Sequence, residues 1–357
     1  MPHLLVDITP HGYGHVSQTS AVVNELVRLL PQLRITIRTT VPLSFLQQRF
    51  QCNFQHIPVA FDFGMKMANA VDVQIAESDI AYREFHADWQ QKVAREADDL
   101  RHLKPNLLLA NIPYLTLAAA QAAKVPAVGM CCLNWADIYQ HYCVDDAISQ
   151  NIHTQMLEAY NSADYFLKVE PAMDMPAFNN LHRIQPIARI GHPRCEQISA
   201  HCSLVEGEKL VLVAMGGMEF RLPMQDWPSL PGVRFIVPQA WHVQREDVVA
   251  FEALNMAFTD VLASCDAIIT KPGYGTFAEA ACNGVPVIYV TRRNWPEEPY
   301  LVQWLVHNAR CIEIEREALQ RGEIAQVLKT LWAQTIPLRP AAHGAIEAAN
   351  FLHANYL

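Results

Sequence analysis

The chain has little charge of either sign and none of the sequence features of a nucleic-acid-binding protein. Of its 357 residues only 18% are charged, acidic residues outnumber basic ones by 36 to 27, and the formal net charge is −9. No run of lysine and arginine occurs, so the electrostatic signature of a nucleic-acid binder is missing. Hydrophobic residues make up 51% of the chain, which is too much for intrinsic disorder. The lack of basic runs argues against a general nucleic-acid partner, and the high hydrophobic fraction argues against a disordered chain.

Signs of export and of membrane insertion are also scarce. The nine cysteines form no Cys-x-x-Cys pair, and no Asn-x-Ser/Thr sequon occurs. An odd number of cysteines with apolar neighbours indicates reduced core thiols rather than disulfides or zinc. No basic stretch precedes Asp7, as a signal peptide would require, and the charge-free stretch 105–123 is interrupted by proline and polar residues. We therefore expect a cytoplasmic protein without a transmembrane segment.

Short apolar runs alternate with amphipathic stretches, which indicates strand–helix units and parallel sheets. The first half has expected strands at 4–8, 34–38, 107–110 and 127–131, expected helices at 17–30, 42–50 and 115–123, and a polar helical stretch at 76–103. The pattern restarts near residue 208, with strands at 209–214, 234–237, 267–270 and 287–290 and a helix at 276–282. We predict an α/β fold of two doubly wound domains, 1–190 and 207–340, followed by a helix at 341–357.

The first glycine-rich loop, Gly12-Tyr13-Gly14-His15, follows the first expected strand. Doubly wound sheets bind ligands beyond the carboxyl ends of their strands, where this loop falls. A dinucleotide fingerprint would need glycine at Ser17 and an acid where the second strand ends in Arg38, which argues against NAD and leaves NADP as an alternative. A glycine hinge that brings His15 to a helix N-terminus suggests a general base, kept neutral by the helix dipole. The alternative is a histidine that only caps the helix, and a zinc pair with His11 lacks further ligands nearby.

Two more loops follow strands in the second half. Gly216 and Gly217 would let backbone amides approach a phosphate. The loop from Lys271 to Thr276 precedes a helix whose first amides would receive an anion, and Glu279 is placed to accept two ribose hydroxyls. A capping box of Thr276 and Glu279 explains the same spacing, and both interpretations can hold together.

These residues resemble those of nucleotide-sugar glycosyltransferases of the GT-B fold. The stretch Thr270 to Gln303 is similar to the donor-binding segment of the family that attaches N-acetylglucosamine to lipid-linked cell-wall precursors. It is more similar still to the glycosyltransferase-like N-terminal region of plant arabinokinases, in Gly273–Thr276, Glu279-Ala280 and the segment Arg292 to Pro299. The first loop and residues 134–139 extend the resemblance, whereas 45–100 and 140–205 match poorly.

The resemblance implies two Rossmann-like domains facing across a cleft, with the acceptor in the first, the donor in the second, and the C-terminal helix packing on the first. It implies that His15 is the catalytic base, on an acceptor side formed by His11, Gly12, Gly14, Asn111, Asn134 and Trp135. It implies donor contacts from Gly216, Gly217, Phe258, Lys271, Gly273, Gly275, Thr276, Glu279, Arg292, Arg293, Glu297 and Glu298. Relatives orient the base with an aspartate where this chain has Asn111, so Asp137 is a second candidate for that catalytic role. Trp135 and Trp295 either stack on a sugar or belong to the packing.

The expected function is an inverting, metal-independent transfer of a hexosyl or N-acetylhexosaminyl group, with a UDP-sugar as the expected donor and a hydroxyl as the acceptor. No Asp-x-Asp stands at a strand end, so helix N-termini and cations would stabilise the departing diphosphate. The alternatives are a nucleotide-sugar hydrolase or epimerase and a non-catalytic nucleotide-sugar-binding protein. No cofactor is expected besides the nucleotide sugar, which is a substrate. Residues 61–101 are the expected acceptor wall, and their composition favours a soluble acceptor.

Overall fold

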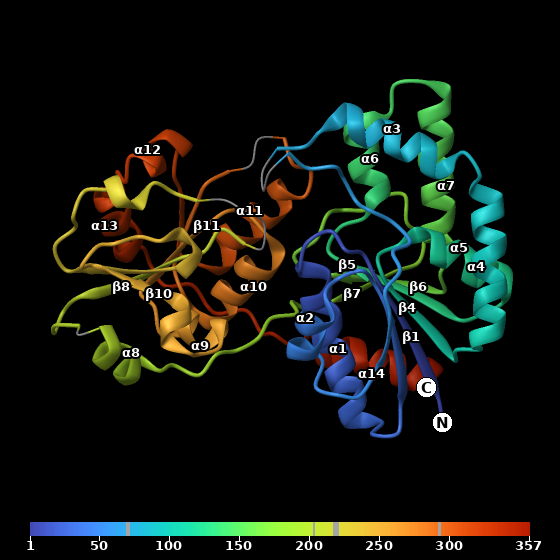
Figure 1. The fold of residues 1–357 in the computed structure, drawn as a ribbon, viewed down its shortest axis with the longest axis horizontal. Coiled ribbons are helices and arrows are strands. Elements are labelled where there is room, and N and C mark those ends of the chain that lie inside the picture. Colours follow the sequence, from blue (N-terminus) through green and yellow to red (C-terminus); the bar gives the residue numbers. More distant parts are fainter. Residues whose placement is uncertain (69–71, 203, 217–220, 292–293) are drawn as a thin grey trace. The chain divides into compact units, whose positions relative to one another are not determined.

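The computed structural model describes residues 1–68, 72–202, 204–216, 221–291 and 294–357. The chain divides into two compact units, each built on its own parallel β-sheet (Figure 1). Unit 1 contains residues 1–68, 73–187 and 343–357, so it takes its parts from both ends of the chain. Unit 2 is built from residues 188–342 and includes Asp72.

Unit 1 has a seven-stranded sheet in the order β3-β2-β1-β4-β5-β6-β7, and every neighbouring pair is parallel. The register places Asp7 beside Arg38 and Ile8 beside Asn111 at the carboxyl ends of three central strands. In chain order the elements are β1 (His3–Ile8), α1 (Gly14–Leu29), β2 (Arg34–Arg38), α2 (Leu43–Arg49), β3 (Gln55–Ile57), α3 (Ile75–His86), α4 (Trp89–Leu103), β4 (Leu107–Asn111), α5 (Tyr114–Ala123), β5 (Ala127–Cys131), α6 (Trp135–Cys143), α7 (Ala147–Asn161), β6 (Tyr165–Val169), β7 (Leu181–Ile184) and α14 (Gly344–Tyr356).

Unit 2 has a six-stranded parallel sheet in the order β10-β9-β8-β11-β12-β13. Its elements are α8 (Cys195–Cys202), β8 (Lys209–Val213), η1 (Met224–Asp226), β9 (Val233–Val237), η2 (Gln239–Trp241), β10 (Val248–Ala250), η3 (Phe251–Leu254), α9 (Phe258–Ala263), β11 (Ala267–Thr270), α10 (Tyr274–Asn283), β12 (Val287–Tyr289), α11 (Glu298–Asn308), β13 (Cys311–Glu313), α12 (Arg316–Gln320) and α13 (Ala325–Ala333). Both sheets have the Rossmann strand order, in which the chain direction across the sheet reverses beside the first strand.

This architecture confirms the predicted α/β class with two doubly wound domains. Some local expectations differ from it. The first helix begins at Gly14, three residues before the expected start at Ser17, and the stretch 76–103 is two helices, α3 and α4, rather than one. Helices α6 and α7, which the apolar pattern did not indicate, begin at side-chain caps supplied by Asn134 and Asp146.

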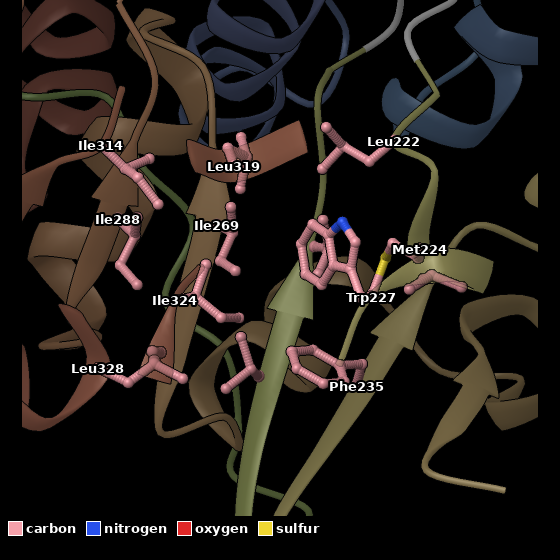
Figure 2. Close-up of a cluster of buried hydrophobic side chains, with 14 of the residues drawn as sticks. Leu222, Met224, Trp227, Phe235, Ile269, Ile288, Ile314, Leu319, Ile324 and Leu328 are labelled. Atoms are coloured by element: carbon pink, nitrogen blue, oxygen red, sulfur yellow. The ribbon is translucent and has the colours of Figure 1, made fainter. Parts of the chain in front are cut away.

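A buried cluster on one face of the second sheet supports the strands that lead to the candidate site of unit 2. Figure 2 shows Trp227 and Phe235 on one side of this cluster and the strand residue Ile288 on the other, with Ile269 between them. The rings of Trp227 and Phe235 are 5.9 Å apart and meet edge to face. Because interiors are close-packed, this cluster holds the ends of β8 and β11 in a defined position.

Helix α14 packs against α1 and β7 of unit 1, although residues 188–342 separate it from them in sequence (Figure 1). Its first residue, Gly344, donates its amide to Pro186 O at 3.1 Å. A Cβ at this position would collide with Gln185 O and lie 3.0 Å from Ile187 Cγ1. Only glycine allows the helix to start so close to the neighbouring backbone.

The cysteines remain thiols, most of them buried. Over the residues that the structure describes, the helices are all too short or too polar to cross a bilayer.

The close approach at Gly344 predicts a cost for added volume. Replacing Gly344 with alanine should lower the free energy of unfolding by about 1–3 kcal/mol, because the backbone of 185–187 has to shift. Urea denaturation measures this. Ile346→Ala, at a residue that is 45% exposed on the same helix, should change stability by about 0.5 kcal/mol or less. Equal stability of Gly344→Ala and the wild type would contradict the described docking of α14.

Candidate functional site

The two strand reversals place one candidate site in each unit. In unit 1 the reversal lies between β1 and β4, whose ends lead to the loop before His15 and to Asn111. In unit 2 it lies between β8 and β11, whose ends lead to Gly216 and Lys271. Open α/β sheets bind ligands at such reversals because the flanking loops diverge there.

His15 is the second residue of α1 and is 7% exposed. Its Nδ1 lies 2.8 Å from Asn111 Oδ1, while Asn111 Nδ2 faces Gln18 Oε1 at 3.2 Å. The amide of Asn111 is thereby oriented with its oxygen toward the ring, and an oxygen of this kind only accepts. Nδ1 therefore carries the ring proton in the neutral form, and Nε2 is the nitrogen that can take a proton.

Cys131, at the end of β5, is the second group beside the ring, with its Sγ 3.7 Å from Nδ1. Burial by itself would lower the pKa of His15. The adjacent Cys131 thiolate, Asn111 and Asp62 raise the pKa by more than burial lowers it, so it lies at about 9. Burial raises the pKa of Cys131, whereas Cys132 and His15 lower it by more. The direction of this shift is opposite to the expectation that the helix dipole keeps His15 neutral.

Asn134 and Asp137 form a helix cap rather than a part of the His15 contact. Asn134 is the N-cap of α6, its Oδ1 accepts the Asp137 amide at 2.8 Å, and its Nδ2 donates to Asp137 Oδ2 at 2.9 Å. Burial raises the pKa of Asp137, opposed by Asn134 and by the charge of His153. Asn111, rather than Asp137, is thus the residue that orients His15.

Trp135 joins His11, His15 and a loop that the sequence analysis did not single out. Its buried ring lies 5.2 Å from the ring of His11 and 6.0 Å from that of His15, so it belongs to the packing. Gly64, with φ +67°, closes on this group, and a Cβ there would lie 2.8 Å from both His11 Nδ1 and Trp135 Cη2. The signal in the sequence was Phe61-Asp62-Phe63-Gly64, a polar residue and a glycine shortly after a strand.

That loop brings in Asp62, which sequence reasoning missed. Asp62 is 6% exposed, and its Oδ2 accepts the hydroxyl of Thr9 at 2.6 Å. Thr9 Oγ1 in turn accepts the Ile112 amide at 3.1 Å, and the Thr9 amide donates to Asn111 O at 2.9 Å. Asp62 is therefore connected to the residue that orients His15.

Arg38 is buried in an ion cluster below this site. It is 3% exposed, contacts both Asp7 oxygens at 2.7 and 2.6 Å, and reaches Glu96 Oε1 at 2.6 Å. Burial lowers the pKa of Arg38, but the two carboxylates raise it by more. Two acidic partners already occupy the guanidinium, so Arg38 offers no support for a 2′-phosphate and for the NADP alternative.

In unit 2 the candidate donor loop is arranged around the start of α10. The N-cap is Gly273, no side chain caps this terminus within the described residues, and Gly275 and Thr276 are the second and third helical residues. Because the helix begins before Thr276, the capping-box interpretation of Thr276 and Glu279 is wrong. The first amides of a helix have no partner inside the helix and point outward with the positive end of the dipole.

Lys271 stands three residues before the start of α10 and lies against the loop after β8. Gly216 has φ +82°, and a Cβ built there would lie 3.3 Å from Lys271 Cε and 3.5 Å from Nζ. The structure therefore brings Gly216, Lys271 and the α10 terminus together at the ends of two adjacent strands. A cation and outward backbone amides at one place are the chemistry of an anion site.

The remaining donor-side residues lie on the two helices that pack against α10. Phe258 is the first residue of α9, with its ring 6.1 Å from that of Phe251. Glu297 is the N-cap of α11 and Glu298 is its first residue, and both are buried. Glu297 Oε2 accepts the indole N–H of Trp295 at 3.1 Å. Trp295 is buried as well and belongs to the packing. Gly217, Arg292 and Arg293 lie outside the described residues.

No protein-family model matches the chain. The chain is similar to an L-arabinokinase of Arabidopsis thaliana, with 23% identity over 344 residues that cover 95% of this chain and 32% of the plant protein. It therefore spans about a third of the length of that relative.

Solved glycosyltransferases have the same fold over nearly the whole chain. CalG4, the calicheamicin glycosyltransferase, is 16% identical with a TM-score of 0.63, covering 99% of this chain and 98% of its own. UGT89C1 of Arabidopsis thaliana complexed with UDP is 16% identical with a TM-score of 0.62, covering 100% of both chains. SnogD from Streptomyces nogalater is 14% identical with a TM-score of 0.55, covering 99% of both chains. The chain thus has the GT-B fold of two Rossmann-like domains.

Two glycines of the first site offer a matched pair for testing its packing. Gly12 (φ +76°) and Gly64 (φ +67°) share a left-handed backbone, but nothing lies within 4 Å of a Cβ at Gly12. Gly12→Ala should cost about 1–2 kcal/mol of unfolding free energy from the backbone alone. Gly64→Ala should cost about 1–3 kcal/mol more, because it displaces His11 or Trp135. Urea denaturation of both variants measures the difference, and equal costs would refute the described packing of the Gly64 loop.

Proposed function

We propose that the protein is a glycosyltransferase that moves a sugar from a nucleotide-diphosphate donor to a hydroxyl acceptor with inversion of configuration. The observation that carries the proposal is the histidine fixed by Asn111 at Nδ1, at the strand reversal of unit 1. A histidine held in this way presents Nε2 as a proton acceptor. The GT-B fold adds support as an analogy, since a fold alone does not fix a function.

The donor half of the proposal lies in unit 2. Gly216, Lys271 and the amides at the start of α10 form a place for a diphosphate, and Glu279, further along the same helix, is the proposed ribose ligand. Phe258, Glu297 and Glu298 are the proposed contacts to the base and to the sugar. We propose UDP as the nucleotide because UGT89C1, which shares the fold, has been solved with UDP and with UDP-L-rhamnose.

The reaction needs one proton transfer and one displacement. Nε2 of His15 takes the proton of the acceptor hydroxyl, and the oxygen attacks the anomeric carbon from the face opposite the diphosphate. The bond from that carbon to the diphosphate oxygen breaks, and the nucleoside diphosphate leaves with the electron pair. Lys271 and the α10 amides stabilise the charge that develops on the leaving group, so the proposed mechanism assigns no role to a metal.

The sugar and the setting are also part of the proposal. A hexosyl or N-acetylhexosaminyl group and a soluble acceptor are proposed, together with a cytoplasmic location in which the buried thiols stay reduced. The proposal of a soluble acceptor is consistent with the name of one structural neighbour, the calicheamicin glycosyltransferase CalG4.

Replacing His15 tests the base. After a thermal-shift screen of nucleotide sugars has identified a donor, His15→Ala should lower kcat by about 10²–10⁴-fold while the donor Kd stays unchanged, because the donor residues lie in unit 2. The wild-type rate should rise with pH toward about 9, since His15 must lose its proton before it can accept one from the acceptor. Steady-state kinetics against pH and calorimetric titration of the donor supply both measurements.

His102→Gln serves as the control, because His102 is exposed on α4 away from the site. Full turnover by His15→Ala would show that another group is the base. Stoichiometric release of the nucleoside diphosphate without any acceptor would favour a hydrolase, and donor binding without turnover would favour a binding protein.

Lys271 should matter for the diphosphate and not for the nucleoside. Lys271→Met should weaken UDP binding by about 10- to 100-fold, which is the contribution of one charge-assisted contact, and leave uridine binding unchanged. Lys329→Met, at an exposed position on α13, is the matched control. Calorimetric titration with UDP and with uridine distinguishes the two, and an unchanged UDP affinity would contradict the assignment.

A further inference from the structure

Asp62 is a buried carboxyl group that lacks a conventional cationic partner. Its Oδ2 accepts the Thr9 hydroxyl, and its Oδ1 is a buried oxygen without a hydrogen bond of normal geometry among the described residues. Over the same residues no lysine or arginine forms an ion pair with it. Such a carboxyl group is costly to ionise unless a positive charge lies nearby. Burial accordingly raises the pKa of Asp62 to about 6, although Thr9, His15 and Trp135 act to lower it.

The loop around Asp62 is fixed by three independent contacts. On one side, the ring of Phe61 lies under the Arg38 guanidinium at 4.3 Å. On the other, the rings of Phe63 and Tyr82 are 4.7 Å apart, and Gly64 closes on His11 and Trp135. A loop held at each of these residues places the Asp62 carboxyl group in a defined position.

Among the titratable groups around Asp62, His15 is the one whose positive charge lowers the pKa of Asp62. The groups that act on its charge or are acted on by it are Asp7 of β1, His15 of α1, Tyr82 of α3, Tyr114 of α5 and Tyr160 of α7. Of these, His15 is the group that can become positive, and His11, which lies against Gly64 and Trp135, is the second histidine beside the loop. His15 also packs on Trp135, whose indole lowers the pKa of Asp62.

One residue near His15 orients the ring, and other residues can balance its positive charge. Asn111 fixes the ring through Nδ1 but is neutral, so it cannot balance a charge on the imidazolium. The acids near the ring are Cys131 of β5 and Asp62, and both favour the protonated form.

We propose that Asp62 is the counter-charge of His15 and acts as a positioning residue for the base. As His15 takes the proton of the acceptor, the Asp62 carboxylate stabilises the imidazolium, while Asn111 fixes the ring. The role in the reaction rests on the proposed function, whereas the pairing of the two charges does not.

The pairing can be measured without any substrate. We would follow the imidazole signals of isotope-labelled histidine by NMR against pH in this chain, which has 15 histidines, and assign His15 from the signal lost in His15→Gln. Asp62→Asn keeps the size and removes the charge, so the pKa of His15 should fall by about one pH unit. Asp62→Glu should keep it raised. Asp137→Asn removes a nearby carboxyl group that faces Asn134 and His153 instead, and should leave the pKa of His15 as in the wild type.

An unchanged His15 titration in Asp62→Asn would overturn the proposal and leave Cys131 as the source of the raised pKa. If Asp62→Asn does not fold, Asp62→Ser removes the charge but keeps a polar atom beside Thr9, and the same criterion applies to it.

Kinetics separate this proposal from the proposed function. If the chain is a transferase, the acid limb of its kcat/KM profile should move to lower pH in Asp62→Asn by the amount that NMR gives, with donor Kd unchanged. If the pKa of His15 measured by NMR falls in Asp62→Asn but the protein has no transferase activity, the pairing is upheld and the function is refuted. If the enzyme is active but the pKa of His15 is the same in Asp62→Asn as in the wild type, the function is upheld and the pairing is refuted.

Discussion

The bidentate contact between Arg38 and Asp7 is the interaction on which the first site depends. The parallel register sets these two residues side by side at the ends of β1 and β2, and Glu96 of α4 completes the cluster. A buried ion cluster is stable only as a complete set, because each member left alone would be an uncompensated charge. The guanidinium of Arg38 also packs over the ring of Phe61. The loop that contains Asp62 is therefore positioned by the same cluster.

The two units use the same strand order for different chemistry. In unit 1 the reversal gathers side chains from several strands and loops, namely His15, Asn111, Cys131 and Asp62. In unit 2 the reversal presents mainly backbone amides, bared by glycine, together with one lysine. In the proposed glycosyl transfer, the side chains of unit 1 would take the proton of the acceptor and the amides of unit 2 would hold the departing diphosphate.

The sequence predicted what local patterns determine, and missed what depends on distant residues. Apolar runs and glycines are local, so the central strands, the three loops and His15 could be recognised before the structure, whereas β3, β6, β7, β10 and β13 were missed. The partner of His15 is 96 residues away, and only the strand register decides that Asn111 rather than Asp137 reaches the ring. The loop of Asp62 carried a weak local signal, but the contact of Asp62 with the site could not be recognised, because it depends on the fit of Gly64 against His11 and Trp135. The raised pKa of His15 escaped prediction for the same reason, since Cys131 lies on another strand.

The composition of unit 1 from both ends of the chain has a consequence for the order of folding. Residues 188–342 are synthesised between the last strand of unit 1 and α14, so the ribosome releases all of unit 2 before the helix that covers α1. Domains generally fold as they are made, and unit 2 can therefore complete its core first. The surface of α1 that contacts α14 stays uncovered during this interval. The protein must keep that surface from aggregating until its final helix arrives.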